Sequence, residues 1–271
     1  MDYLTRDDAP FDEQQWEAID NTVVSAAKRV LTARRVLPFN GNATIETQFA
    51  RIDGWDRAEE FDDAGIVKST NRKVVEIPQL YADFWLYWRD LADAKNNGVP
   101  MDLSAAEMAA QRVARLEDEM VFYGVPGMNI EGLLTVKGSQ SIKKGNWGEG
   151  EASFTDVAKG IEALEGKGHI GRHSLFVSPD VYVQLQRIQD GTGVLESERI
   201  EKLLSGKLVK STALKANTAL LVCAEAYCMD LLVGQDIRTA YIEAVDLNHH
   251  LRVLETAVVR IKAPDAIVVY K

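Results

Sequence analysis

The sequence of 271 residues contains very little cysteine. Its two cysteines, Cys223 and Cys228, are separated by four residues in the apolar stretch LLVCAEAYCMD. So few cysteines exclude a disulfide framework, and no second pair of Cys or His nearby completes a zinc site. We therefore expect two buried free thiols, the usual state in a reducing cytosol.

The chain also lacks segments for export or membrane insertion. Its first residues, MDYLTRDDAPFDEQQW, are acidic and contain no apolar core, so they do not have the pattern of a signal peptide. No apolar run approaches the length of a membrane span. These patterns predict a cytoplasmic protein with no membrane partner.

Positive charge is in deficit. The 31 Lys and Arg residues are outnumbered by 41 Asp and Glu residues, which gives a formal charge of −10. Because phosphate binding needs clustered Lys and Arg, this balance argues against nucleic acid as a partner. Hydrophobic residues make up 46% and charged residues 27% of the chain, as in an ordinary globular protein with a sizeable core.

Motifs of the common enzyme classes are missing as well. The sequence has no P-loop, no dinucleotide-binding glycine fingerprint, no Gly-x-Ser-x-Gly elbow and no Glu-x-x-His pair. Glu117, Asp118 and Glu119 are consecutive, and successive helical residues face different ways, so we expect a solvated helix face there and no acid–base pair. His249 and His250 would point to opposite faces of a strand, and we expect Asn248 and His249 to start a turn.

Histidine is scarce too, and two of the four histidines fall in the glycine-rich stretch GKGHIGRH. His169 and His173 could converge on a metal, and a small metal-dependent enzyme that uses them is one functional alternative. No carboxylate or Cys of fixed spacing accompanies them, however, so the metal-site signal is weak.

The residues that are present predict an α+β protein. Asp12 and Gln15 form a capping box before a helix that ends near Ala33. Residues 40–73 are polar, glycine-rich and too long for an ordinary connection, which indicates a two-stranded arm that needs a partner subunit. Further helices are expected over 84–94, from 102 to about 123, around 157–164, from 179 to 188, and over 196–204. Strands are expected over 174–178, 219–223, 229–233, 251–262 and 266–270.

An ordered set of segments resembles the family 1 encapsulins over nearly the whole chain. The segments are the opening helix with its basic pair, DFWLYWRDL, PMDLSAAEMAAQRVARLEDEMVFYG, EGLLTV, LFVSPDVYVQLQRI, GVLESERIEKL, LVGQDIRTAY and LRVLETAVVRIKAPDAI. The resemblance implies the tailed-phage major capsid protein fold of the Hong Kong 97 type. It assigns the N-terminal helix to 1–39, the extended E-loop to 40–73, a peripheral domain with the spine helix to 74–129, an axial domain to 130–245, and C-terminal strands that return to the peripheral domain to 246–271.

The resemblance also implies a function, which is not enzymatic. Encapsulins self-assemble in the bacterial cytoplasm into a closed icosahedral shell of the T = 1 or T = 3 type. They enclose cargo enzymes such as ferritin-like proteins, hemerythrins or dye-decolorising peroxidases, in the contexts of iron storage and oxidative stress. The cargo docks through a C-terminal peptide, and the matching positions are Val23, Ala27, Val30, Leu31, Arg34, Asp236 and Ile237.

Two further expectations follow from the resemblance. The loop Glu165, Gly166, Lys167, Gly168, His169, Ile170 and Gly171 would line a pore on the fivefold axis, with His169 as a pH-sensitive ring. No cofactor is required, although some encapsulins bind a flavin near an aromatic residue. Trp85 and Trp88 are the candidates for that residue, with core packing as the favoured role of both. The capsid subunit of a defective prophage is the alternative within this fold.

Overall fold

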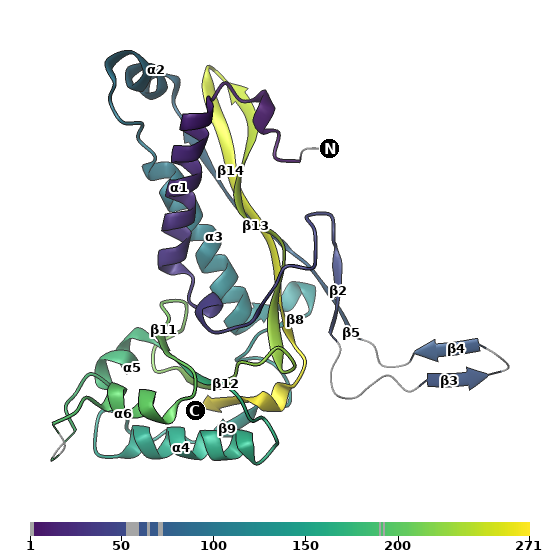
Figure 1. Cartoon of the computed structure of the whole chain (residues 1–271), viewed down its shortest axis with the longest axis vertical. Coiled ribbons are helices and arrows are strands. Elements are labelled where there is room, and N and C mark those ends of the chain that lie inside the picture. Colours follow the sequence, from purple (N-terminus) through teal and green to yellow (C-terminus); the bar gives the residue numbers. More distant parts are fainter. Residues whose placement is uncertain (1–2, 53–59, 64–65, 70–72, 190, 192) are drawn as a thin grey trace.

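The computed structural model describes residues 3–52, 60–63, 66–69, 73–189, 191 and 193–271. It consists of a long upright unit built on one sheet, a second unit at its foot, and an arm that projects sideways (Figure 1). Two hydrophobic cores correspond to this division, one beside α1 and the other in and above the foot. The chain is therefore an α+β protein, as its sequence predicts.

The upright unit, called here the long-sheet unit, has four strands in the order β1-β13-β14-β6. These are Phe39–Asn40, Met229–Val245, Asn248–Ile261 and Gln79–Leu86. Helices α1 (Glu13–Val30) and α3 (Ser104–Tyr123) pack together beside this sheet (Figure 1). The predicted capping box is confirmed, because Asp12 accepts from the Gln15 backbone while the Gln15 side chain accepts from the Asp12 backbone.

Strand β6 corrects the expectation of a helix over 84–94. Its burial alternates, with Ala82, Phe84 and Leu86 buried between exposed neighbours. An alternation of two residues is typical of a strand with one solvent-exposed face, and the strand pairs with β14 along its whole length. Helix α2 begins only at Trp88 and ends at Asn97.

The unit at the foot, called here the five-stranded unit, has strands in the order β11-β10-β12-β15-β9. They are Leu208–Lys210, His173–Val177, Ala219–Cys223, Ile267–Tyr270 and Gln140–Ile142. Helices α4 (Ala152–Glu165), α5 (Pro179–Gln184) and α6 (Glu196–Leu203) belong to this unit. Helix α5 is shorter than predicted, and Ile188, expected to point inward, is 63% exposed beyond its end.

The β13–β14 hairpin corrects the predicted domain boundaries. Strand β13 enters the long sheet at Met229, so the axial domain expected over 130–245 ends earlier. The final strand β15 lies between β12 and β9 in the five-stranded unit, so the C-terminal strands do not all return to the long sheet. The hairpin turns at Asp246 and Leu247, both with positive φ, so Asn248 and His249 pair in β14 instead of starting a turn.

The arm begins with β2 (Phe49–Ile52) and β5 (Lys73–Glu76), which pair antiparallel. Strands β3 (Glu60–Asp63) and β4 (Ile66–Ser69) form a second ribbon farther out (Figure 1). Of the arm predicted over 40–73, Asn40 belongs to β1 of the long sheet, and residues 53–59, 64–65 and 70–72 lie outside the described residues. Shorter elements complete the chain: β7 (Gly124–Val125), β8 (Ile130–Glu131), and 3-10 turns at Arg6–Asp8, Ala33–Arg35, Pro126–Met128 and Pro264–Ala266.

Candidate functional site

Most apolar positions predicted for peptide docking on α1 are part of the long-sheet core. Val23, Ala27 and Leu31 are at most 6% exposed, and Ile237 of β13 is equally buried. They face inward because α1 packs its apolar stripe against α3 and the sheet. Their side chains are therefore closed to a docking peptide in this chain, whereas Val30 is partly exposed.

Arg34 and Asp236 meet, although they are far apart in sequence. Arg34 Nη1 donates to Asp236 Oδ1 at 2.7 Å, and the Asp236 side chain remains 61% exposed. The ring of Phe39, a residue that the sequence analysis did not select, lies 5.9 Å from the Arg34 guanidinium and is 58% exposed. An exposed aromatic ring thus lies next to an exposed carboxylate that one arginine holds in place.

Beneath this surface, Arg34 is bound to two buried carboxylates. Its Nη2 is 2.6 Å from Glu117 Oε2, and it also pairs with Glu255. Burial raises the pKa of Glu255, and the neighbouring Glu117 charge acts in the same direction. Both glutamates are fully buried, so the predicted solvated face at 117–119 is wrong for Glu117.

Asp118 is also buried, because it caps the turn that follows α1. Its carboxylate accepts from the Thr32 and Ala33 backbone amides at 2.9 Å and from Thr32 Oγ1 at 2.6 Å. Burial raises the pKa of Asp118 to about 6, although the hydrogen bonds from Thr32 oppose this. Only Glu119 of the three acidic residues faces solvent.

The loop after α4 closes on itself. The His169 amide donates to Leu164 O at 3.0 Å and the Gly168 amide to Glu165 O at 2.8 Å, with Gly168 at φ +84°. Glycine suits that left-handed conformation. Lys167 is exposed, and Ile170 is 73% exposed.

His169 is the exception in this loop, because its ring points inward. It is 4% exposed, with Nε2 3.0 Å from Asp265 Oδ1 and Nδ1 3.6 Å from Cys228 Sγ. The prediction that this ring faces a pore is therefore wrong for the chain as folded. The polar partners inside the five-stranded unit account for the inward position.

Cys223 and Cys228 are free and buried, as predicted. They contact His173 and His169, so the fold brings together residues that sequence spacing could not connect. Among the described residues, nonetheless, no group of three or more His, Cys, Asp or Glu side chains is placed to hold a metal ion. Nothing in the described geometry favours the metal-dependent alternative.

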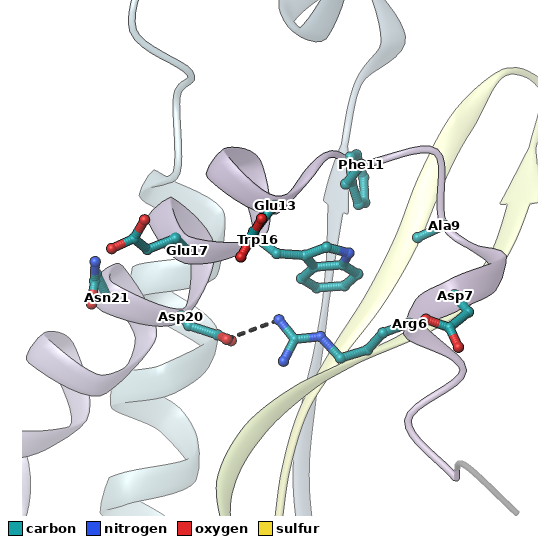
Figure 2. Close-up of a pocket in the computed structure, with 9 residues that line it drawn as sticks. All are labelled: Arg6, Asp7, Ala9, Phe11, Glu13, Trp16, Glu17, Asp20 and Asn21. Atoms are coloured by element: carbon teal, nitrogen blue, oxygen red, sulfur yellow. Dashed lines mark hydrogen bonds and ion pairs between the residues drawn. The ribbon is translucent and has the colours of Figure 1, made fainter.

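A groove of about 720 Å³ lies where the N-terminal segment meets α1 (Figure 2). Arg6 lies over the Trp16 ring at 4.0 Å and pairs with Asp20 at 2.8 Å, and Phe11 meets Trp16 edge-on. The Tyr241 amide donates to Leu4 O at 2.9 Å, which holds the segment against β13. The lining is mostly acidic and polar: Arg6, Asp7, Ala9, Phe11, Glu13, Trp16, Glu17, Asp20 and Asn21.

The two tryptophans considered for a flavin are not core residues, contrary to the favoured expectation. Trp85 is 36% exposed on the outward face of β6, and its ring stacks on His250 at 4.5 Å. Trp88 is 42% exposed at the start of α2.

In the described part of the chain, no helix combines the length and apolar composition needed to cross a membrane.

Comparison with known proteins gives a consistent result. Residues 1–258 match the family model described as "Encapsulating protein for peroxidase". The type 1 encapsulin shell protein EncA of Myxococcus xanthus is 35% identical, over 98% of this chain and 95% of the relative. A diheme-cytochrome-encapsulin shell fusion protein of Kuenenia stuttgartiensis is 34% identical, over 94% of this chain and 72% of the relative. A ferritin-like-encapsulin shell fusion protein of Pyrococcus furiosus is 24% identical, over 83% and 59%.

Solved structures agree on the fold. The virus-like particle from Pyrococcus furiosus superposes with a TM-score of 0.77 at 21% identity, covering 96% of this chain and 100% of that one. The capsid of the Myoviridae phage XM1 superposes with a TM-score of 0.64 at 11% identity, covering 88% and 90%. At such identities the similarity shows the fold alone, which is that of the tailed-phage capsid proteins.

Proposed function

Since the chain belongs to the encapsulin family and is a structural shell protein with a capsid-like fold, we propose that it closes into an icosahedral compartment. This compartment holds cargo enzymes and lies in the bacterial cytoplasm. Peroxidase-type and ferritin-like cargo are the classes that the family description and the fused relative suggest. Such contents fit iron storage and oxidative-stress defence.

The arm carries the proposal of assembly. In the β2–β5 ribbon, Ala50 and Val75 are buried, while Phe49 and Val74 on the other face are 60% and 59% exposed. Ala50 and Val75 belong to the core in and above the foot, so this face of the ribbon packs on its own subunit, while the face of Phe49 and Val74 is turned away from it. Two large apolar side chains on a projecting ribbon lose their contact with water when a neighbouring subunit covers them.

The test is particle formation by a Phe49→Ser/Val74→Ser variant. Lys73→Gln, on the same strand but the other face, is the matched control. Negative-stain microscopy and size-exclusion chromatography should show closed particles for wild type and control, and free subunits for the double variant. Wild-type protein that remains monomeric would refute assembly, and intact particles of the double variant would refute the role of this ribbon face.

We assign cargo docking to the surface around Arg34, Phe39 and Asp236, together with the partly exposed Val30 at the end of α1. Phe39 offers an apolar contact, and the exposed Asp236 carboxylate can pair with a basic residue. The peptide that fits carries apolar side chains next to an Arg or Lys. Because Asp236 is fixed by Arg34, its carboxylate is already oriented when the peptide arrives.

Co-expression with a reporter that ends in such a peptide tests this assignment. Phe39→Ala and Asp236→Asn particles should each retain less reporter than wild type, whereas Val99→Ala, an exposed apolar residue elsewhere, should retain all of it. Equal loading of all four shells would refute the assignment. Particle counts by microscopy separate a loading defect from an assembly defect.

A flavin stacked on Trp85 is a secondary proposal. His250 covers one face of the indole, so the other face is available for a planar ring, which when bound would supply electron transfer. Trp85→Leu should remove the flavin absorbance of purified shells, and Trp88→Leu should retain it. The reverse result would move the site to Trp88, and colourless wild-type shells after reconstitution with flavin would eliminate it.

A further inference from the structure

A buried group of reactive side chains lies directly under the loop 165–171. Cys223 ends β12, and after a short turn Cys228 leads into β13. Both thiols are free and fully buried. The Cys228 amide donates to Glu225 O at 2.9 Å, which closes a tight turn between the two cysteines, and Cys228 lies close enough to Cys223 to lower the pKa of that thiol.

Two histidines act on these sulfurs. His173 lies directly opposite Cys223 in the β10–β12 pair, and its Nε2 lies 2.9 Å from His169 O. A carbonyl oxygen only accepts, so His173 Nε2 carries a proton and the other ring nitrogen can take the Cys223 proton. Next to the second sulfur, His169 Nδ1 lies 3.6 Å from Cys228 Sγ, while Asp265 Oδ1 lies 3.0 Å from Nε2 in an ion-pair contact without hydrogen-bond alignment. The carboxylate charge stabilises a proton on Nε2, which leaves Nδ1 as the basic nitrogen.

The two thiols are electrostatically unequal. The neighbouring Cys228 thiol lowers the pKa of Cys223, with His173 acting in the same direction and burial opposing both. The proximity of Cys223 raises the pKa of Cys228. A thiolate beside a protonated thiol is the arrangement of a peroxide-reactive cysteine with its resolving partner.

We propose that Cys223 and Cys228 form a dithiol that hydrogen peroxide oxidises to a disulfide, and that this oxidation loosens the loop 165–171. The Cys223 thiolate attacks one peroxide oxygen, so an S–O bond forms, the O–O bond breaks, and hydroxide leaves as water after taking a proton. Cys228 loses its proton to His169 Nδ1 and attacks the sulfenic sulfur. The S–S bond forms, the S–O bond breaks, and hydroxide leaves with that proton as a second water.

The net reaction is two thiols and one peroxide to one disulfide and two waters, in which the thiols are oxidised and the peroxide is reduced. Tyr227 is 41% exposed and its Oη lies 4.0 Å from Cys223 Sγ, so movement of this side chain is the step that the proposal requires for peroxide to reach the buried thiol. The disulfide shortens the distance between the two sulfurs to about 2 Å, which requires movement of the turn 224–227.

That turn and the loop are joined by two contacts. Tyr227 Oη donates to Ile170 O at 3.2 Å, and His169 contacts Cys228 Sγ. Disulfide formation removes the Cys228 proton from the contact with His169. It also shifts Tyr227 relative to its hydrogen-bond partner Ile170 O. This consequence rests on the proposed function. In a shell whose loop lines a pore, peroxide would thereby change the passage of ions and small solutes through that pore.

The chemistry is tested on purified wild-type protein treated with hydrogen peroxide. We expect a mass loss of two hydrogen atoms and a Cys223–Cys228 linkage in the non-reducing peptide map. Cys228→Ser should stop at the sulfenic acid, which dimedone labels on Cys223, and Cys223→Ser should not be labelled. Absence of the disulfide, or equal labelling of both variants, would overturn the dithiol assignment.

The coupling is tested by hydrogen exchange of the loop peptide. Exchange over 165–171 should be faster in the oxidised protein by up to about tenfold, the equivalent of one lost hydrogen bond. The Cys223→Ser variant treated identically is the matched control and should not change. A disulfide that leaves loop exchange unchanged would refute the coupling. Both measurements work on unassembled subunits as well as on particles, so a failure to assemble is recognised separately by microscopy.

Discussion

Arg34 binds Glu117 through two nitrogens, with Nε 2.8 Å and Nη2 2.6 Å from Glu117 Oε2. The arginine lies just beyond α1 and the glutamate is fully buried on α3, so this pair joins the two helices of the long-sheet unit. The same guanidinium binds the exposed Asp236. One residue therefore stabilises the interior and shapes the surface assigned to cargo.

Replacing this arginine should destabilise the subunit strongly. Arg34→Met leaves Glu117 and Glu255 buried without their cation, and breaking a buried pair in this way costs about 3–5 kcal/mol. Arg35→Met is the control. Arg35 is the exposed neighbour of Arg34, so its replacement should have almost no effect on stability. Urea unfolding of both variants measures the difference, and equal midpoints would contradict the structural role of Arg34.

Asp118 should make stability depend on pH. Burial raises its folded pKa from 3.8 to about 6, so the folded state favours the protonated carboxyl. That contribution is complete below pH 3.8 and is lost as pH rises through about 6. Asp118→Asn cannot ionise, so the free energy of unfolding of wild type relative to this variant should fall as pH rises. Denaturant titrations at about pH 5 and about pH 7.5 measure it, and a constant difference would disprove it.

Gly160 provides a steric test within α4. A Cβ there would overlap Tyr270 Oη, a buried hydroxyl with no hydrogen-bond partner in the described structure. Gly160→Ala should therefore lower the free energy of unfolding by about 1–3 kcal/mol, although alanine favours a helix. Adding Tyr270→Phe removes the overlapping atom and should recover most of the loss. If the double variant is no more stable than Gly160→Ala, the overlap is not the cause.

The exposed Lys167 should influence ion passage if the loop lines a pore. Lys167→Glu replaces a positive ring by a negative one, which should speed ferrous iron entry into loaded shells. Lys159→Glu, at an exposed position of α4 outside the loop, is the charge-matched control. Stopped-flow iron oxidation by enclosed cargo gives the rate. Identical oxidation rates for wild type and both variants would contradict the expectation that this loop lines the pore through which iron enters.

Periodicity and capping predicted the elements that are formed locally. The Asp12–Gln15 box and the apolar stripe of α1 lie within one helix, so their signal is contained in neighbouring residues. Strand β12 matches its prediction residue for residue, since a short, fully apolar run bounded by turns is too short for a helix. The family resemblance supplied the capsid fold, which composition could not.

What was missed depends on contacts between distant residues. Glu117 has the composition of a solvated position and becomes buried only because Arg34, 83 positions earlier, reaches it. His169 turns inward because Asp265 and Cys228 come from other strands. The helix expected at Phe84 is a strand because β14 offers an edge, and that edge exists only after the hairpin has formed. No local pattern carries this information.

The β13–β14 hairpin has a mechanical consequence. Its lower part is buried in one core, with Met229 and Val259, and its upper part in the other, with Ile237 and Leu251. Two hydrogen-bonded strands resist bending far more than a linker does, so the angle between the units is fixed by backbone geometry. The register shifts on either side of Gln235 are where that ladder is interrupted. Strain imposed by a closed surface would therefore concentrate at a few residues, and substitutions there would alter the curvature of the particle before they altered either core.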